Sequence, residues 1–130
     1  MNLALWIVQI LLAVLFLGQG VIKFAPPPNL PDMLQWVYDL HNASPGLSAF
    51  IGIAELLGVA GLILPGLTKI QPRLTPLAAL GLMVVMVLAV IYHLQRGEPA
   101  NIGFNVVVFI LAGFVAYGRW RLSPLRGRTP

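Results

Sequence analysis

The sequence has 130 residues, of which 9% are charged and 58% are hydrophobic. Soluble domains carry about 25% charged residues, so this composition excludes a soluble globular enzyme and a disordered chain. The sequence contains no cysteine, which excludes thiolate nucleophiles, cysteine-ligated metals and dithiol relays formed within the chain. The formal net charge is +4, and the basic residues border apolar stretches. This placement favours contact with anionic lipid headgroups over nucleic acid.

The first of four long apolar stretches runs over residues 3–24, which exceeds the roughly 17 residues needed to cross the hydrocarbon of a bilayer. It has neither a basic leading region nor a small-residue cleavage site, so we expect a retained span rather than a removed signal peptide. Three consecutive prolines at 26–28 follow it. Because proline lacks an amide donor, they end the predicted helix.

A short amphipathic segment follows between Leu30 and Asn42, with apolar and polar side chains on opposite faces of a helix. Pro31 suits the first position of that helix. Trp36 and Tyr38 are residue types that favour the headgroup boundary. We expect a helix that lies on the membrane surface or caps the mouth of the bundle.

Three further spans are predicted at residues 47–64, 74–94 and 102–118. The span at 47–64 is rich in glycine and alanine, which let helix backbones approach closely, and Pro65 with Gly66 is expected to end it. The sequence thus predicts an all-α integral membrane four-helix bundle with a short amphipathic helix between the first two spans. We expect a single domain over residues 1–130.

The basic residues favour one orientation in the membrane. If the N-terminus is cytoplasmic, six basic residues lie on the cytoplasmic side and two on the other, which is the bias that sets topology in membrane proteins. We therefore expect a multi-pass protein with both termini in the cytoplasm. The six are Lys69, Arg73, Arg119, Arg121, Arg126 and Arg128, and the two are Lys23 and Arg96.

Glu55 is the most informative residue of the sequence. It lies near the middle of the span at 47–64, and at about 1.5 Å per residue this places it close to the bilayer midplane. An unpaired carboxylate there costs at least about 2.5 kcal/mol. We therefore expect Glu55 to be protonated, paired or beside water.

Other polar residues fall on the predicted inner faces of the spans. Gln9, Gln19 and Lys23 share one stripe of the first span at spacings of three and four, while His93 and Asn105 lie on the inner stripes of the third and fourth. With cytoplasmic termini, these residues other than Gln9 lie in the outer half of the membrane. We expect them to form a polar funnel that opens outward and ends at Glu55.

This funnel supplies the candidate site. We expect Glu55 and His93 to relay protons, with Lys23 as the counter-ion, but no catalytic residue is assigned. A metal held by His41 and His93 is not expected, because no carboxylate stands at a spacing that would support either ring. The candidate cofactor-binding residues are Gln19, Lys23, Glu55, His93 and Asn105.

A purely structural role explains the same residues in another way. Lysine and histidine are common at the ends of spans and need no function there, and glutamines form hydrogen bonds between membrane helices. On this hypothesis Glu55 only fixes the register of the helices. The two hypotheses differ in whether a ligand contacts the polar groups.

Several landmarks in order along the chain resemble the DoxX-like family of small four-helix bacterial membrane proteins, from residue 3 to Arg119. The resemblance implies a protein of the bacterial cytoplasmic (inner) membrane. The family takes its name from a subunit of a quinol oxidase that is also linked to thiosulfate:quinone oxidoreduction, and some relatives look like membrane parts of oxidative-stress or thiol-related complexes. The matching residues are Gly20 with Lys23, then Glu55-Leu56-Leu57-Gly58, Gly61-Leu62 and Pro65, then Ala79-Leu80-Gly81-Leu82 with Met86, then His93 and Arg96-Gly97-Glu98.

Three functions are compatible with these observations. The leading hypothesis is a redox-associated membrane subunit that binds a quinone or another lipophilic molecule in the funnel, with a partner protein supplying electrons. The second is a non-catalytic assembly or scaffold protein that forms a hetero-complex. The third is a proton-coupled transporter of a small solute, which requires a homo-oligomer because four short helices enclose only a narrow pathway. The chain is not expected to be an enzyme on its own.

Overall fold

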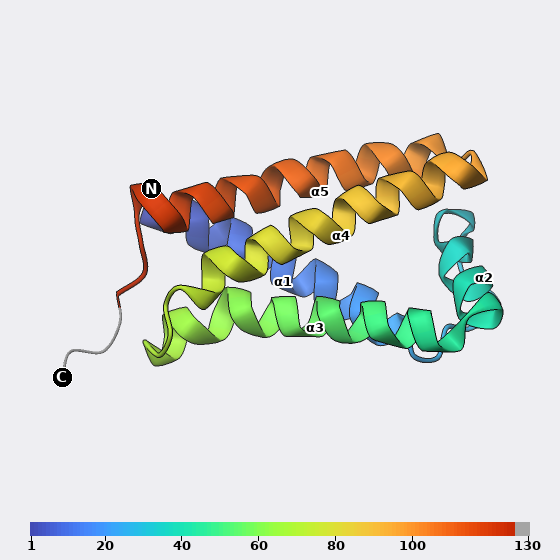
Figure 1. Ribbon diagram of the computed structural model, residues 1–130, viewed down its shortest axis with the longest axis horizontal. Coiled ribbons are helices and arrows are strands. Elements are labelled where there is room, and N and C mark those ends of the chain that lie inside the picture. The colour runs from blue at the N-terminus through green and yellow to red at the C-terminus, as the bar shows by residue number, and fades with distance from the viewer. Residues whose placement is uncertain (127–130) are drawn as a thin grey trace.

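The computed structural model describes residues 1–126, and these form an all-α bundle (Figure 1). Four long helices run side by side, and a short one lies across one end of them. Each long helix is long and apolar enough to cross a membrane, which confirms the predicted all-α membrane bundle. The long helices are α1 (Asn2–Ile22), α3 (Pro45–Thr68), α4 (Leu74–Arg96) and α5 (Pro99–Tyr117), and the short one is α2 (Gln35–Ala43).

The two ends of the bundle differ in what they hold. Both termini and the loop between α3 and α4 lie at one end, which we call the terminal end (Figure 1). Helix α2 and the connection between α4 and α5 lie at the other, which we call the α2 end. A turn of π-helix, Gly118–Leu122, continues α5 at the terminal end. Arg128, one of the basic residues used to predict orientation, lies outside the described residues.

The prediction that Pro65 and Gly66 end the second span was wrong. Helix α3 continues through Pro65 to Thr68, and Lys69 follows in the left-handed conformation with φ 59°. The other spans agree with the prediction to within a few residues at each end, including the extension of α5 from residue 102 back to Pro99. The spanning helix α3 is therefore longer than the sequence predicted.

Hydrogen bonds from neighbouring helices explain how α3 accommodates Pro65. Proline has no amide hydrogen, so the carbonyl of Gly61, four residues earlier, loses its donor within the helix. Thr75 of α4 donates its hydroxyl to that carbonyl at 2.7 Å. Gln9 of α1 donates its side-chain amide to the adjacent carbonyl of Leu62, also at 2.7 Å. Such bonds between helices let membrane helices keep an internal proline.

Helices α1 and α3 approach each other closely at two glycines. A Cβ atom at Gly52 would lie 2.9 Å from the carbonyl oxygen of Gly20, and a Cβ at Gly20 would lie 2.9 Å from the side chain of Leu56. Farther along α3, a Cβ at Gly61 would lie 2.5 Å from Ala78 of α4. The small residues of α3 thus serve packing within the chain's own bundle.

The core confirms the predicted inner stripes of the helices. Buried side chains from all four long helices meet at the centre, while large apolar side chains cover the outside, where a spanning bundle faces lipid. The predicted stripes continue Gln9, Lys23, His93 and Asn105 at spacings of three and four, and their buried members are Gln9, Leu12 and Phe16 of α1 with Lys23 just after it, Leu82, Met86 and His93 of α4, and Asn105, Ala112 and Ala116 of α5 with Arg119 just beyond it.

The amphipathic segment is helical, but it begins later than predicted. A 3-10 turn at Asp32–Leu34 precedes α2, so Pro31 stands before that turn and is not the first residue of an α-helix. Val37 and Leu40 are buried against the bundle. Helix α2 thus covers the end of the bundle, one of the two positions expected for it.

Candidate functional site

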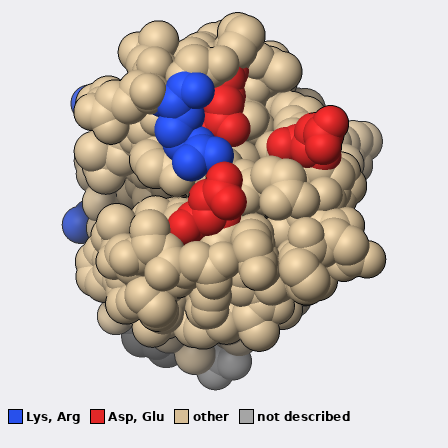
Figure 2. Space-filling model, turned by 90° about the vertical axis from the view of Figure 1, so that its right-hand side faces the viewer, with Lys and Arg blue, Asp and Glu red and all other residues tan. Residues whose placement is uncertain are grey.

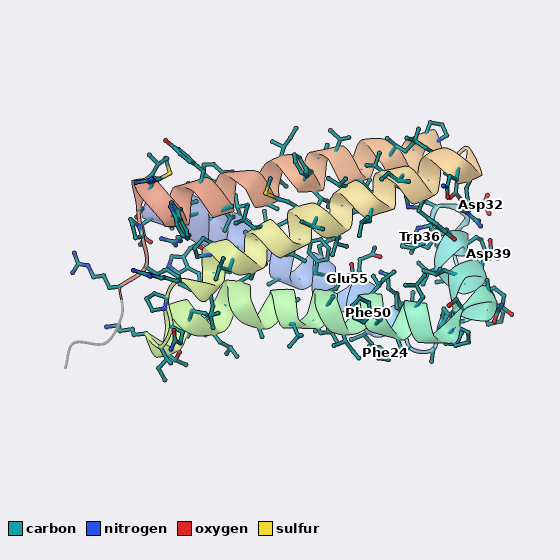
Figure 3. The ribbon with its side chains drawn as sticks, in the orientation of Figure 1. Phe24, Asp32, Trp36, Asp39, Phe50 and Glu55 are labelled. Carbon is teal, nitrogen blue, oxygen red and sulfur yellow. The ribbon has the colours of Figure 1, made fainter. Side chains whose placement is uncertain are left out.

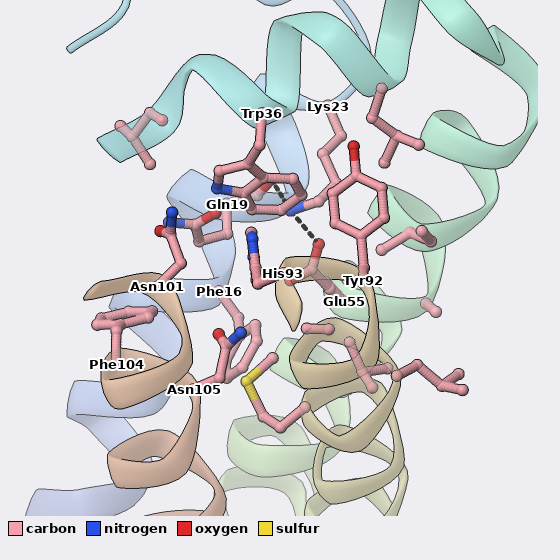
Figure 4. A pocket seen from close by; sticks show the side chains of 18 of the residues that line it. Phe16, Gln19, Lys23, Trp36, Glu55, Tyr92, His93, Asn101, Phe104 and Asn105 are labelled. Atoms are coloured by element: carbon pink, nitrogen blue, oxygen red, sulfur yellow. Dashed lines mark hydrogen bonds and ion pairs between the residues drawn. The ribbon is translucent and has the colours of Figure 1, made fainter. Parts of the chain in front are cut away.

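A cavity of about 700 Å³ lies at the α2 end, and all five helices contribute to its wall (Figure 4). Most of the wall is apolar, from residues such as Phe16, Met86 and Phe104. The structure brings all five predicted cofactor-binding residues into this wall. The polar and aromatic side chains there are Gln19, Lys23, Trp36, Glu55, Tyr92, His93, Asn101 and Asn105.

Glu55 points from α3 into the bundle (Figure 3) and is paired with Lys23, one of the three states expected for it. The Lys23 Nζ and Glu55 Oε1 atoms are 2.6 Å apart, and the two side chains are 2% and 3% exposed. Side chains on a helix lean toward its N-terminus, so the Lys23 stem runs back along α1 into the bundle and donates to the Gln19 carbonyl at 3.1 Å. The close approach of Gly20 and Gly52 brings the two helices within reach of this pair.

The backbone of Lys23 is also held in place. Its carbonyl accepts a hydrogen bond from the Ser48 hydroxyl at 2.7 Å, and His41 Nδ1 lies 3.2 Å from the same oxygen. Ser48 belongs to α3 and His41 to α2, so both helices contact the end of α1. These contacts hold the backbone of Lys23 in place, at the point from which its side chain reaches Glu55.

His93 belongs to a second polar chain that leads from the cavity wall to the exposed face. Its Nδ1 lies 2.9 Å from Glu98 Oε1, and Arg96 Nε donates to the same oxygen at 2.9 Å. Arg96 also pairs with Asp39 of α2 at 2.7 Å. Figure 2 views this end, where acidic side chains lie beside a basic one. Burial alone would raise the pKa of Glu98, but its hydrogen bonds to His93 and Arg96, with the positive charge of Arg96, hold that pKa below its usual value.

Trp36 lies between these two polar groups, and the sequence analysis, which considered it only as a residue of the headgroup boundary, did not include it in the site. Its ring centroid is 5.1 Å from Lys23 Nζ and 4.9 Å from the His93 ring, which it meets edge-on. Figure 4 shows the indole reaching from α2 toward the lysine. The spacing Met33, Trp36, Val37 and Leu40 would have placed it on the inner face of the amphipathic helix.

Asn101 is the second site residue that the sequence analysis missed. It is 7% exposed, in the first turn of α5, and lines the cavity one helical turn from Asn105. The spacing of four residues between the two asparagines was the signal for it. Its predicted location in a loop before the last span concealed it.

Two hydrogen-bond donors in the cavity wall have no partner among the described residues. They are the indole nitrogen Nε1 of Trp36 and the amide nitrogen Nδ2 of Asn105, and both atoms are buried. Buried polar groups are hydrogen-bonded in the large majority of cases, so unpartnered ones call for an explanation. The cavity can therefore offer two donors to a bound molecule that carries acceptor oxygens. Within residues 1–126 no three His, Asp or Glu side chains lie together in a way that could hold a metal ion.

A second buried polar cluster lies at the terminal end, away from the cavity. Arg119 is 2% exposed and donates to Gln9 Oε1 at 2.6 Å, to Asn2 Oδ1 at 2.7 Å and to the Ser123 carbonyl at 2.9 Å. Its guanidinium also lies 5.6 Å from the ring centroid of Trp6. The sequence analysis counted Arg119 among the basic residues at this end, and its side chain is buried within the bundle there.

Four spanning helices around an apolar cavity with a buried ion pair define a small multi-pass membrane protein of the all-α bundle class. Residues 7–115 match the model of the DoxX-like family, and the chain belongs to that family. No curated protein and no solved structure matches it. The resemblance inferred from the ordered landmarks of the sequence is thus confirmed.

Proposed function

We propose that this DoxX-like protein is a redox-associated membrane subunit that binds a quinone, or a similar lipophilic molecule with a carbonyl head group, in the cavity at the α2 end. The observation that carries the proposal is an apolar cavity of about 700 Å³ whose wall holds two unpartnered donors, Trp36 Nε1 and Asn105 Nδ2. Small-molecule sites combine such a volume with a few well-placed polar groups. Carbonyl oxygens are the natural partners of these donors.

The charges in the cavity wall favour a ligand whose head group is uncharged. Lys23 and Glu55 compensate each other at 2.6 Å, so the cavity presents no net charge from this pair. An anionic head group would meet a neutralised lysine and the carboxylate beside it, whereas a carbonyl oxygen requires only a donor. A quinone has carbonyl oxygens on an apolar ring with an apolar tail, which fits the wall.

The polar chain gives the proposal a proton route. Reduction of a quinone to a quinol takes up protons as well as electrons, and a partner protein supplies the electrons. In this proposal His93 takes up protons from the exposed face through its contact with Glu98, and Glu55, with Lys23 as its counter-ion, accepts these protons and passes them to the reduced head group. Trp36 lies between the lysine and His93, so a head group bound beside the indole would connect the two halves of the route.

We also propose the bacterial cytoplasmic (inner) membrane as the location, with both termini in the cytoplasm. The support is the distribution of charge: Lys69, Arg73, Arg121 and Arg126 belong to the loop and tail at the terminal end, where Figure 1 also shows the termini. Cytoplasmic ends of spans carry such an excess of basic residues. A reporter fused to the C-terminus that is active only in the cytoplasm tests this orientation, and activity of a periplasm-specific reporter would contradict it.

The structure gives less support to the two other functions, a scaffold protein and a proton-coupled transporter. A scaffold would use the small residues of α3 to contact other membrane proteins, and these residues pack against α1 and α4 of the same chain. Leu12, Leu62 and Val115 belong to the packed core of the protomer, so a transporter would need a pathway between protomers. The ligand-binding function is the one that uses the cavity and its unpartnered donors.

Equilibrium binding of decylubiquinone to the protein in lipid nanodiscs tests the proposal. Trp36→Phe removes the N–H and keeps a ring, and Asn105→Leu removes the amide at similar volume. Each is expected to weaken binding by up to about tenfold, because one hydrogen bond contributes about 0.5–1.5 kcal/mol. Trp120→Phe is the matched control, since Trp120 is half exposed and lies outside the cavity wall. Wild-type protein that binds no decylubiquinone, or variants that bind it as wild type does, would overturn the proposal.

A further inference from the structure

Within the membrane-spanning helices, the wall of the cavity is exposed on one side only. The lining residues from α1 and α5, such as Phe16 and Asn105, are all buried or half-buried. On the opposite side, Phe50 of α3 is 69% exposed and Leu88 of α4 is 61% exposed, and both line the cavity. The cavity therefore reaches the surface of the bundle between α3 and α4. Figure 1 shows these two helices diverging toward the α2 end.

The end of the cavity that faces away from the membrane is covered by α2 and by the segment before it, whose Pro31 and Met33 line the cavity and are exposed on their outer side. Helix α2 lies across it, with Trp36 over Lys23 and with Val37 packed into the bundle. The ion pair between Arg96 and Asp39, at 2.7 Å, ties α2 to the end of α4. The funnel predicted from the sequence was open to the aqueous side, and α2 covers that side.

The depth of the side opening places it beside lipid. Phe50 lies five residues into α3 from Pro45, and Leu88 lies eight residues before the end of α4 at Arg96. At about 1.5 Å per residue, the opening is about 8–12 Å below the α2 ends of these helices. In a bundle whose helices span the bilayer, that depth reaches the hydrocarbon of the leaflet on the α2 side.

We infer that the ligand enters the cavity sideways from the bilayer, through a portal between α3 and α4, while α2 keeps the aqueous end closed. The portal consists of the exposed Phe50 and Leu88 with the smaller Ala54 and Ala89, and all four line the cavity. None of them is polar, so the route admits an uncharged lipophilic molecule dissolved in the membrane and excludes charged solutes. The inference rests on the proposed function only for the identity of the ligand.

The absence of cysteine from the sequence allows a direct test. In the Asn101→Cys variant, the single thiol lies on the closed α5 wall of the cavity. In nanodiscs we expect an uncharged, lipid-dissolved maleimide to label it at least about tenfold faster than a sulfonated maleimide, because charged groups are excluded from hydrocarbon. The Asn42→Cys variant is the control, since Asn42 is exposed on α2 and should react with the sulfonated reagent. Equal labelling of both variants by the sulfonated reagent would overturn the inference.

Narrowing the portal gives a second measurement on the same thiol. Ala54→Leu or Ala89→Leu, added to Asn101→Cys, should slow labelling by the lipid-dissolved reagent several-fold, whereas Ala100→Leu should leave the rate unchanged, because Ala100 is exposed and lies outside the cavity wall. Unchanged rates in both narrowed variants would also overturn the inference. Neither measurement involves quinone. Failure to bind decylubiquinone therefore contradicts the proposed function alone, and labelling from water contradicts the portal alone.

Discussion

The two ends of the bundle bury polar side chains in different ways. At the α2 end, Lys23 and Glu55 pair at 2.6 Å in the wall of a cavity. At the terminal end, Arg119 and Gln9 bond to each other at 2.6 Å, and neither lines that cavity. Both clusters are buried to a similar degree, so burial of polar groups does not by itself distinguish a ligand site from a structural one.

The partners of the polar atoms make that distinction. The side-chain amide of Gln9 accepts a hydrogen bond from Arg119 and donates one to the Leu62 carbonyl, so both ends of the amide are bonded within the protein. In the cavity wall, Trp36 and Asn105 each keep a donor without a partner among the described residues. The Arg119 nitrogen Nη2 also lacks one, but it lies outside the wall. Unpartnered donors that face a cavity point to a ligand, and a closed network points to stability.

The largest expected effect comes from breaking the ion pair. Lys23→Met leaves the Glu55 carboxylate buried without its cation and is expected to lower the free energy of unfolding by about 3–5 kcal/mol. The double variant Lys23→Met/Glu55→Leu should recover most of that loss, because no buried charge is left. Denaturation by sodium dodecyl sulfate from mixed micelles measures both. Lys69→Met is the control, since Lys69 is exposed, and a double variant no more stable than the single one would contradict the pairing.

The terminal-end cluster should affect stability without affecting the ligand. Arg119→Met leaves the side-chain oxygens of Gln9 and Asn2 without this donor and is expected to cost about 1–3 kcal/mol of unfolding free energy. Binding of decylubiquinone should stay at the wild-type level. Arg121→Met removes an exposed charge from the same turn and serves as the control. If Arg119→Met weakens quinone binding as much as Trp36→Phe does, the separation of the clusters by role is wrong.

A smaller effect tests how the terminal-end contacts support α3 at its proline. Thr75→Val keeps the shape of the side chain but removes the hydroxyl that donates to the Gly61 carbonyl. The expected cost is about 1 kcal/mol of unfolding free energy. Pro65→Ala restores an amide donor within α3, so Thr75→Val should cost less in that background. Equal costs in the two backgrounds would show that the threonine does not compensate for the proline.

The features that could be predicted from the sequence are those that depend on a single helix. Apolar length defined the four spans, and spacings of three and four residues placed Lys23, His93 and Asn105 on inner faces that converge on one cavity. The expectation that Glu55 needs a partner, protonation or water followed from the cost of an unpaired charge at its depth, and the structure supplies Lys23.

What the sequence could not provide depends on contacts between helices. The continuation of α3 past Pro65 is supported by the Thr75 hydroxyl from α4, which no property of the α3 sequence reveals. The inward position of Trp36 depends on α2 lying across the end of the bundle rather than along the membrane surface. The side opening depends on the divergence of α3 and α4. Each of these misses concerns the relative position of two helices.

The smallest expected effect concerns the polar chain that joins the cavity to the exposed face. Because its contacts with His93 and Arg96 lower the pKa of Glu98 below its usual value of 4.5, ionised Glu98 stabilises the fold above about pH 4.5. That contribution is lost as the pH falls below 4.5 through the lowered pKa. Glu98 is 21% exposed, so we expect at most about 1 kcal/mol.

Unfolding curves of wild-type protein and the Glu98→Gln variant, measured between neutral pH and pH 3, check this prediction. The two proteins should differ most at neutral pH and converge in acid, whereas Asp32→Asn, at an exposed residue of the same end, should not reproduce that convergence. A difference that persists unchanged in acid would mean that Glu98 acts through packing and not through its charge. His93 would then have no charged partner linking the cavity to the surface, and the proton route at the α2 end would lose its outer step, although the cavity and its unpartnered donors would be unaffected.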